Sequence, residues 1–231
     1  MKQFESDEAA GYDLSMPLRV PLYLGIQQLA GTLLEAHLGP SARVLVVGAG
    51  TGTEITAMAQ ANPGWHFTAV DPSAAMLGIA AEKAARNGVL DRVRLLECRI
   101  EDLTVEREWD GAVALLVSHF MPDDGAKARF FGAVSDALAP RAPFVLADLI
   151  DMEEGGALGL RATWPRWATA QGGDPQAVAR MMARVETAFH PVTESRLHLL
   201  LREQGFDVFG RFVQALEFAG YLCFKRGSAH E

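Results

Sequence analysis

A short glycine-rich turn carries the strongest chemical signal in the sequence. "VLVVGAGTGTE", residues 44–54, places branched apolar residues directly before Gly48, Gly50 and Gly52. Because glycine has no side chain and tolerates positive φ, such a turn lets a ligand approach the backbone closely. The helix expected after the turn adds free backbone N–H groups at its amino end. The turn therefore predicts a site for a nucleotide-like ligand.

An acid after the next apolar run narrows the kind of ligand. In "HFTAVDPSAAM" Asp71 follows a second strand-like run, and a carboxylate at that place can accept both hydroxyls of a ribose. The glycines run G-x-G-x-G, and Thr53 stands where a dinucleotide fingerprint prefers a small third residue. This spacing favours a nucleoside cofactor other than NAD.

Candidate catalytic groups follow the later strand-like runs. The fourth run ends in "LLVSHFMPD", which leaves Ser118 and His119 at the same sheet edge as the glycine turn. A neutral imidazole there can take a proton from a phenol or an amine. Asp148, after the fifth run, is the second candidate. The alternative for each residue is an ordinary packing or hydrogen-bonding role at a strand end.

The apolar pattern predicts the elements that position these groups. Between residues 43 and 150, five strand-like runs alternate with helical patterns, which is typical of a parallel sheet with helices on both faces. A further helix is predicted over residues 22–38. "FDVFGRFVQ" and "FAGYLCFKR" close the chain, and their short connection requires an antiparallel pair. We therefore expect an α/β fold with a seven-stranded, mostly parallel sheet and an antiparallel C-terminal hairpin.

Residues 151–192 interrupt this alternation. They include Trp164, Trp167 and Met181, whose aromatic and thioether side chains can shape an apolar pocket for a flat small molecule. Asp174 and Pro175 are suited to the N-cap and the first position of a helix. We interpret the segment as a helical cap inserted over the carboxyl edge of the sheet, within a single domain over residues 1–231.

Composition limits the classes of partner. The 231 residues carry a formal net charge of -8, which disfavours broad contact with nucleic acid phosphates. No stretch resembles a membrane span or a secretory signal. We therefore expect a cytoplasmic protein that acts on a small molecule and has no membrane partner. The sequence leaves open whether it forms a homodimer. Cys98 and Cys223 are predicted to be reduced core residues, and no spacing predicts a metal site.

Four stretches together resemble the class I S-adenosylmethionine-dependent methyltransferases. They are "VLVVGAGTG", "VDPSAAML", "RVRLLECRIEDL" and "WDGAVALLVSHFM". The resemblance covers nearly the whole chain and implies a Rossmann-like sheet with S-adenosyl-L-methionine as cofactor. It also implies cofactor-binding roles: the methionine part is surrounded by Gly48, Ala49, Gly50 and Gly52, the ribose is held by Asp71, the adenine is bordered by Pro72, Ser73, Met76, Ile100 and Glu101, and the sulfonium points toward Ser118.

Two residues depart from the family pattern. Arg99 stands where relatives commonly have an acid, and Val46 stands where many have an acid that helps bind the ammonium group of the cofactor. The turn must therefore hold that ammonium by other means. Backbone carbonyls and the amino-terminal segment are the candidates.

A narrower resemblance concerns both ends of the chain. "GYDLSMPLRVPLY" and "FVQALEFAGYLCFK" resemble segments of carboxy-S-adenosylmethionine synthases and their methyltransferase-like relatives. This resemblance implies that residues 1–40 form a helical lid in which Tyr12, Arg19 and Tyr23 close over the cofactor. The main expectation is O- or N-methylation of a small molecule. The alternatives are a synthase of that kind, serving tRNA wobble-uridine modification, and a non-catalytic protein that binds the cofactor.

Overall fold

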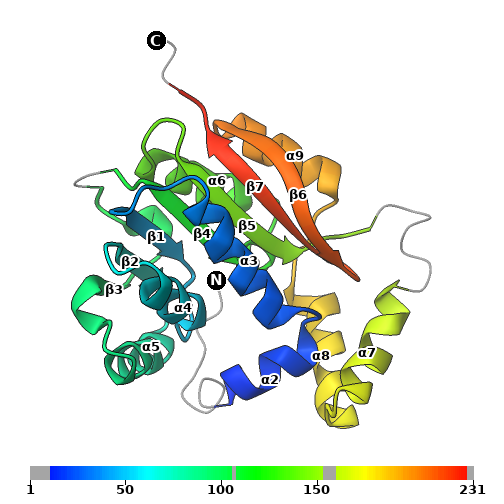
Figure 1. The fold of residues 1–231 in the computed structure, drawn as a ribbon. Coiled ribbons are helices and arrows are strands. Elements are labelled where there is room, and N and C mark those ends of the chain that lie inside the picture. Colours follow the sequence, from blue (N-terminus) through cyan, green and yellow to red (C-terminus); the bar gives the residue numbers. More distant parts are fainter. Residues whose placement is uncertain (1–10, 106–107, 153–159, 228–231) are drawn as a thin grey trace.

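The computed structural model describes residues 11–105, 108–152 and 160–227, and in these ranges the strands form one seven-stranded sheet (Figure 1). The strand order is β3-β2-β1-β4-β5-β7-β6, with β1 to β5 parallel and β7 antiparallel to both β5 and β6. This confirms the predicted sheet and its closing hairpin. The strands are β1 (Arg43–Val47), β2 (His66–Asp71), β3 (Val93–Glu97), β4 (Gly111–Leu115), β5 (Pro143–Leu149), β6 (Phe206–Ala215) and β7 (Phe218–Lys225).

Helices cover both faces of the sheet, as the alternating pattern predicted (Figure 1). The helices α3, α4 and α5 pack on one face, while α6 and α9 pack on the other. Their bounds are α3 (Tyr23–Glu35), α4 (Thr53–Ala61), α5 (Ala74–Arg86), α6 (Ala126–Ala137) and α9 (Glu194–Glu203). Three short 3-10 helices lie next to the strands: η1 (Leu90–Arg92) before β3, η2 (Ile100–Asp102) after β3 and η3 (Ser118–Phe120) after β4.

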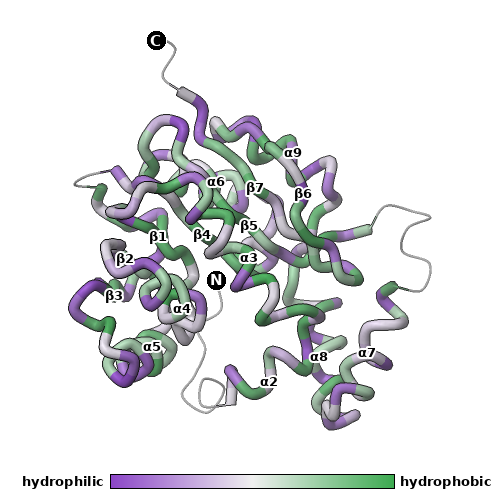
Figure 2. Tube along the Cα trace, viewed as in Figure 1, coloured by the Kyte–Doolittle hydropathy of each residue, from purple (hydrophilic) through white to green (hydrophobic). Residues whose placement is uncertain are grey.

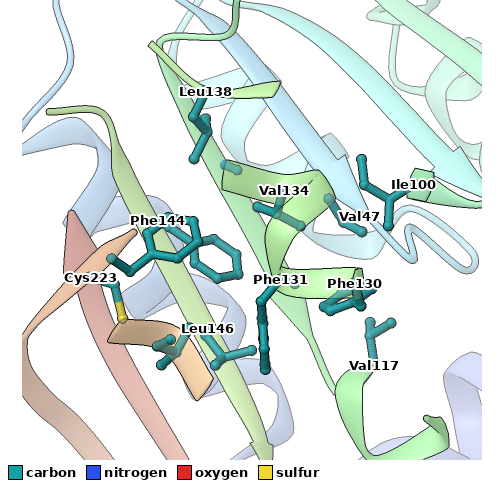
Figure 3. Close-up of a cluster of buried hydrophobic side chains, with 14 of the residues drawn as sticks. Val47, Ile100, Val117, Phe130, Phe131, Val134, Leu138, Phe144, Leu146 and Cys223 are labelled. Atoms are coloured by element: carbon teal, nitrogen blue, oxygen red, sulfur yellow. The ribbon is translucent and has the colours of Figure 1, made fainter. Parts of the chain in front are cut away.

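The central strands are buried on both faces, which explains their unbroken apolar sequence. Along β1, Leu45 and Val47 join the cluster beneath α6 and α9, whereas Val44 and Val46 join the cluster beneath α3 and α4. Figure 3 shows part of the first cluster, in which side chains of α6 approach Val47. Hydrophobic colouring likewise runs along β5 and β7 (Figure 2). The core therefore holds the strand ends that carry the site in fixed positions.

Two helices lie within the expected helical lid and helical cap, although the apolar pattern did not give their individual positions. They are α2 (Tyr12–Arg19) and α7 (Leu160–Ala170), and each contains a proline, Pro17 and Pro165 respectively. Proline inside a helix removes a backbone hydrogen bond, so the local pattern argues against a helix. Tertiary contacts offset this cost: the indole Nε1 of Trp164 donates to the Arg19 carbonyl oxygen at 2.5 Å.

The cap lies at the carboxyl ends of β4 and β5 (Figure 1). In it α7 is followed by α8 (Pro175–Ala188), whose N-cap is Asp174 as expected: the Asp174 Oδ1 accepts from the backbone N–H of Ala177 at 2.8 Å. The excursion leaves and rejoins the sheet at one point, where the backbone N–H of Asp151 donates to the Val192 carbonyl at 2.9 Å. Residues 153–159 of the predicted cap and residues 1–10 of the predicted lid lie outside the described residues.

The two cysteines are free thiols, with Cys223 fully buried and Cys98 half-buried after β3. Within the ranges described, we find no helix that is both long enough and apolar enough to cross a membrane.

Candidate active site

The glycine turn continues directly from β1 and bends over the end of β2. The backbone N–H groups of Gly48 and Ala49 donate to the Val70 carbonyl at 2.8 and 3.1 Å. All three glycines of the turn have positive φ, with Gly48 at 68°, Gly50 at 51° and Gly52 at 69°. The left-handed backbone accounts for glycine at these positions.

The room for a side chain at each of the three glycines shows which of them is required by packing and which could face a ligand. A Cβ on Gly48 would lie 2.5 Å from a methyl carbon of Val117, and one on Gly52 would lie 3.0 Å from the Cβ of Ala80. A Cβ on Gly50 would meet no atom within 4 Å. Gly48 and Gly52 are therefore also required by close packing, while Gly50 faces open space at which a ligand can approach the backbone.

The side chain of Asp71 is hydrogen-bonded both to the glycine turn and to the start of helix α5. Its Oδ2 accepts from the backbone N–H of Gly50 at 2.9 Å, and its Oδ1 accepts from that of Ser73 at 2.8 Å. Ser73 in turn caps α5 by accepting from the Met76 N–H at 3.3 Å. Burial raises the pKa of Asp71 above its usual value. Each carboxylate oxygen has a second lone pair, so the group can still accept a ribose hydroxyl.

Three cavities adjoin along the carboxyl edge of the sheet. The inner cavity, of about 30 Å³, is lined by the glycine turn together with Tyr23 and Glu54. It shares Gly48 with an adenine-side cavity of about 10 Å³, whose wall includes Pro72, Ile100 and Glu101. An outer cavity of about 600 Å³ shares Tyr12 and Leu116 with the inner one. The sequence resemblance implies that the adenine would lie in the adenine-side cavity and the methionine part in the inner cavity. The outer cavity would then be left for the acceptor molecule.

Glu54 is a site residue that the sequence analysis missed. It stands in the first turn of α4 with only 8% of its surface exposed. Burial raises its pKa to about 7, and the negative charges of Asp71 and Asp13 add to this effect, whereas Lys83 opposes it. A buried carboxylate of this kind fits the ammonium group of the expected cofactor, since a cation beside it would stabilise its charge. Val46, at the position where many relatives have an acid, is buried in the core with 1% of its surface exposed. In this protein the acidic side chain beside the turn is instead Glu54 of the following helix, α4.

Helix α2 is tied to the glycine turn by Asp13, a second residue that the sequence analysis missed. Its Oδ1 accepts from the hydroxyl of Thr51 at 2.5 Å and from that of Thr53 at 3.2 Å. Its Oδ2 lies 2.6 Å from the Nζ of Lys83. Burial acts to raise the pKa of Asp13, but these hydrogen bonds and the charge of Lys83 outweigh it and lower that pKa. We call this contact the α2 latch.

The three residues predicted for the lid are distributed over the inner and the outer cavity. Tyr12 lines both the inner and the outer cavity, Tyr23 lines the inner cavity, and Arg19 lines the outer one. Burial raises the pKa of both phenols, so they are neutral at physiological pH. Tyr12 therefore stands between the two cavities, and Arg19 faces the acceptor side.

His119 lines the outer cavity and forms a buried pair with Asp148, which is not part of the cavity wall. The Nδ1 of His119 is hydrogen-bonded to the Oδ1 of Asp148, whose Oδ2 accepts from the backbone N–H of His119 at 3.1 Å. The two side chains are 6% and 1% exposed. Although burial opposes it, the charge and hydrogen bond of His119 lower the pKa of Asp148, with a smaller contribution from Lys127. Because Nδ1 faces the carboxylate, Nε2 is the nitrogen able to accept a proton.

Supporting groups surround this pair. The ring centroid of His119 lies 4.3 Å from that of Phe120 and 4.6 Å from that of Phe189. Ser118 is hydrogen-bonded to Asp148, and its carbonyl oxygen accepts from the Nζ of Lys127 at 2.5 Å. Ser118 thus supports the carboxylate and does not line any of the three cavities.

The predicted acceptor pocket is only partly reproduced. Trp164 and Met181 line the outer cavity, together with Leu149 and Phe218. Trp167 packs against the neighbouring apolar cluster and is not part of the cavity wall. Met76 is 1% exposed inside α5 and is likewise absent from the three walls. Their proposed binding roles remain predictions.

Comparison with known proteins agrees with this geometry. Residues 45–144 match the model of a family described as a methyltransferase domain. This segment runs from β1 through the start of β5 and contains the glycine turn, Asp71 and His119. Over this segment the chain is therefore similar to methyltransferase domains, in agreement with the S-adenosyl-L-methionine cofactor expected from the sequence.

Individual relatives are distant. An uncharacterized protein of Synechococcus sp. is 33% identical over 99 residues, which span 42% of this chain and only 23% of that protein. The carboxy-S-adenosyl-L-methionine synthase of Campylobacter hominis is 24% identical over 230 residues, 97% of this chain and 95% of the synthase. The N-methyltransferase NodS of Bradyrhizobium japonicum, solved with S-adenosyl-L-homocysteine, has a TM-score of 0.66 at 15% identity and 95% coverage of both chains. This last likeness establishes the fold.

Proposed function

We propose that this protein methylates an oxygen or nitrogen atom of a small molecule, with S-adenosyl-L-methionine as the methyl donor. One observation carries the proposal. His119, which is paired with the buried Asp148, lines a cavity of about 600 Å³, and this cavity meets the glycine-turn cavity at Tyr12 and Leu116. A proton acceptor and a space for the acceptor molecule thus adjoin the expected cofactor site.

The residues around the inner cavities fit the cofactor. The open backbone at Gly50 and the carboxylates of Asp71 and Glu54 would hold its polar groups, while Ile100 and Glu101 would border its adenine. When bound, S-adenosyl-L-methionine supplies a methyl group on a positively charged sulfur. The neutral phenols of Tyr12 and Tyr23 would enclose it.

The protein's own contribution is to position the acceptor and accept its proton. Aromatic residues of the cap and of β7 line the outer cavity, and a site that excludes water favours an aligned transfer. The Nε2 of His119 would take the proton released by the hydroxyl or amine of the acceptor. Asp148 would then stabilise the resulting imidazolium charge, as a buried carboxylate beside a histidine does.

The test combines a binding assay with an activity assay. The protein is incubated with S-adenosyl-L-methionine and a panel of phenols and amines, and S-adenosyl-L-homocysteine is measured. His119→Gln and Asp148→Asn should each lower kcat about 100-fold or more, with cofactor affinity unchanged by calorimetry. His66→Gln, at the exposed start of β2, is the control. Absence of cofactor binding would refute the proposal, and binding without turnover on any acceptor would support the non-catalytic alternative.

A second candidate is a carboxy-S-adenosylmethionine synthase-like activity in tRNA wobble-uridine modification. It is favoured by the similarity to the Campylobacter hominis synthase over 97% of this chain. Mass spectrometry of the small molecule released from the purified protein separates the two candidates. A cofactor heavier by a carboxyl group would favour the synthase, and unmodified cofactor would favour the methyltransferase.

The same proposal extends to location and partners. We infer a cytoplasmic protein that acts on a small molecule rather than on nucleic acid, in keeping with the net charge of -8. Residues 1–40 would serve as a lid and residues 151–192 as a cap on a single domain. A homodimer remains a further proposal, which light scattering of the purified protein tests.

A further inference from the structure

We propose that the acceptor carries a carboxylate on an apolar body, and that arginines of α8 and α2 bind this carboxylate in the outer cavity. The inference rests on the proposed function, because it treats the outer cavity as the acceptor site. It concerns the class of acceptor, which neither the fold nor the cofactor determines.

The charge of the cavity wall is the first observation. Among the described residues, the outer cavity is lined by three arginines, Arg19, Arg180 and Arg184, and by no aspartate or glutamate. The chain as a whole has 29 acidic and 21 basic residues. The described part of this wall therefore carries three guanidinium groups in a chain of net negative charge, and it would attract an anion.

The arrangement on α8 is the second observation. Ala177, Arg180, Met181 and Arg184 all line the cavity, and their spacing of three and four residues puts them on one side of the helix. Arg180 and Arg184 are thus one turn apart on the stripe that faces the cavity. Among the described residues, no ion pair is formed by Arg180.

Arg19 approaches the cavity from another element. It ends α2, and its carbonyl oxygen accepts from the indole of Trp164, which fixes this end of α2 to α7. Arginine suits a carboxylate because its planar guanidinium can donate two parallel hydrogen bonds to the two oxygens. Arginines that line one cavity from α2 and α8 can therefore hold a carboxylate between two elements of the enclosure.

The rest of the wall describes the body of the acceptor. Trp164, Phe189 and Phe218 line the same cavity as the arginines, together with His119. An acceptor that is mainly apolar or aromatic would bury its body against these rings. Its carboxylate would face the arginines and its hydroxyl or amine would face His119. A volume of about 600 Å³ is within the ordinary range for small-molecule sites.

A carboxylate could also belong to the cofactor, and the geometry argues against this source. Arg180 and Arg184 line the outer cavity and are absent from the walls of the two cofactor-side cavities. The carboxylate of an ordinary methionine part, expected beside the glycine turn, would therefore not meet them. A cofactor that carries an extra carboxylate at its sulfonium could still place that group near these arginines. The mass of the bound cofactor shows whether such a group is present.

The experiment measures binding in addition to turnover. With S-adenosyl-L-homocysteine saturating, calorimetry compares 4-hydroxybenzoate, 4-hydroxycinnamate and 2-aminobenzoate with their primary amides. At least one carboxylate should bind about tenfold more tightly than its amide. Arg184→Gln and Arg180→Gln should each weaken carboxylate binding by about tenfold, as expected for loss of a charge-assisted hydrogen bond. Arg166→Gln, an exposed arginine of α7 outside the cavity wall, should leave binding unchanged.

The outcomes distinguish this inference from the proposed function. Equal binding of acids and amides, no binding of any acid, or an unchanged Arg184→Gln variant would each overturn the carboxylate proposal. A purified cofactor heavier by a carboxyl group would overturn it too, because it would assign the arginines to the cofactor. Failure of S-adenosyl-L-homocysteine itself to bind would instead refute the proposed function. Circular dichroism of each variant checks that the fold is retained.

Discussion

At the scale of single residues, Gly50 and Gly88 form a matched pair for testing the cofactor site. Both have positive φ, 51° and 67°, and a Cβ on either meets no atom within 4 Å. Replacement by leucine should therefore cost both variants a similar backbone strain of about 1–2 kcal/mol. Only Gly50 lines the inner cavity, so Gly50→Leu alone should abolish detectable cofactor binding in calorimetry. Tight binding by Gly50→Leu, or equal loss in Gly88→Leu, would contradict the assignment.

Glu54 makes stability depend on pH in a defined direction. Its folded pKa of about 7 lies above the ordinary value of 4.5, so the folded state holds the proton more tightly than the unfolded state. The free energy of unfolding should therefore fall as pH rises from about 4.5 to 7, by about 3 kcal/mol in total. Urea titrations at pH 5 and pH 8 measure this change. Glu54→Gln should remove it, whereas Glu82→Gln, on the exposed side of α5, should keep it.

The same residue should couple cofactor binding to proton release. At pH 6 Glu54 is mainly protonated, since its pKa is about 7. A cation placed beside the carboxylate lowers that pKa, so binding should release a proton. Calorimetry in two buffers with different ionisation enthalpies measures the number released. A number that is zero in the wild type, or that persists in Glu54→Gln, would rule out contact between Glu54 and the cofactor's ammonium group.

Sequence reasoning found the residues that end strands and missed those that depend on tertiary contacts. Asp71, His119 and Asp148 follow apolar runs, and the ends of parallel strands necessarily meet at one edge. Glu54 was available in "GTGTE" as an acid in the first turn of a helix, but its burial depends on the packing of α3 against α4. Asp13 carried no local signal, because its partners are 38 to 70 residues away along the chain.

At the scale of elements, the α2 latch should control how long the cofactor stays bound. Asp13→Ala removes both hydroxyl contacts and the ion pair with Lys83, so α2 should detach more readily from the glycine turn. We expect the dissociation rate of S-adenosyl-L-methionine to rise about tenfold, measured by stopped-flow displacement. Asp207→Ala, which removes a remote ion pair with Arg226, should not change this rate.

The pH response of the latch follows from the lowered pKa of Asp13. An acid with a depressed pKa contributes its stabilisation above its unfolded value and loses it only as pH falls through the folded value. The ordinary pKa of an aspartate is 3.8, so Asp13 stays ionised between pH 5 and 8. The dissociation rate should therefore not change with the protonation of the latch in this range. The helices themselves were harder to predict: α2 and α7 contain prolines, and only their packing against each other and the sheet favours the helical state.

At the scale of the whole molecule, cofactor binding should raise thermal stability. A ligand that binds only the folded state stabilises it by about 2.7 kcal/mol at 100 times its Kd. For a chain of this size the corresponding rise in Tm is about 5 to 10 °C. Scanning fluorimetry with S-adenosyl-L-methionine measures the shift, and NAD serves as the control that should give none. A shift with NAD alone would contradict the cofactor class.

Topology was the most predictable property of the molecule. Strict alternation of strand and helix patterns, followed by a short connection between the last two strand-like runs, left few ways to order the sheet. The outer cavity was not predictable, because it forms between α2, α7 and α8, whose mutual positions depend on contacts such as that from Trp164 to Arg19. Trp164 and Met181 were found as pocket residues by composition, while Arg180 and Arg184 became visible only once α8 was placed.

The meeting of the two ends of the cap has an evolutionary consequence. Because Asp151 and Val192 are joined by one hydrogen bond, the predicted cap leaves and rejoins the sheet at a single point, as an inserted segment would. Insertions of this kind can change in length and sequence at small cost to the scaffold. Changes in the cap would therefore alter the proposed acceptor cavity and leave the glycine-turn half of the sheet unchanged, and a cap transplanted from a relative at these two residues would test whether the cap sets specificity.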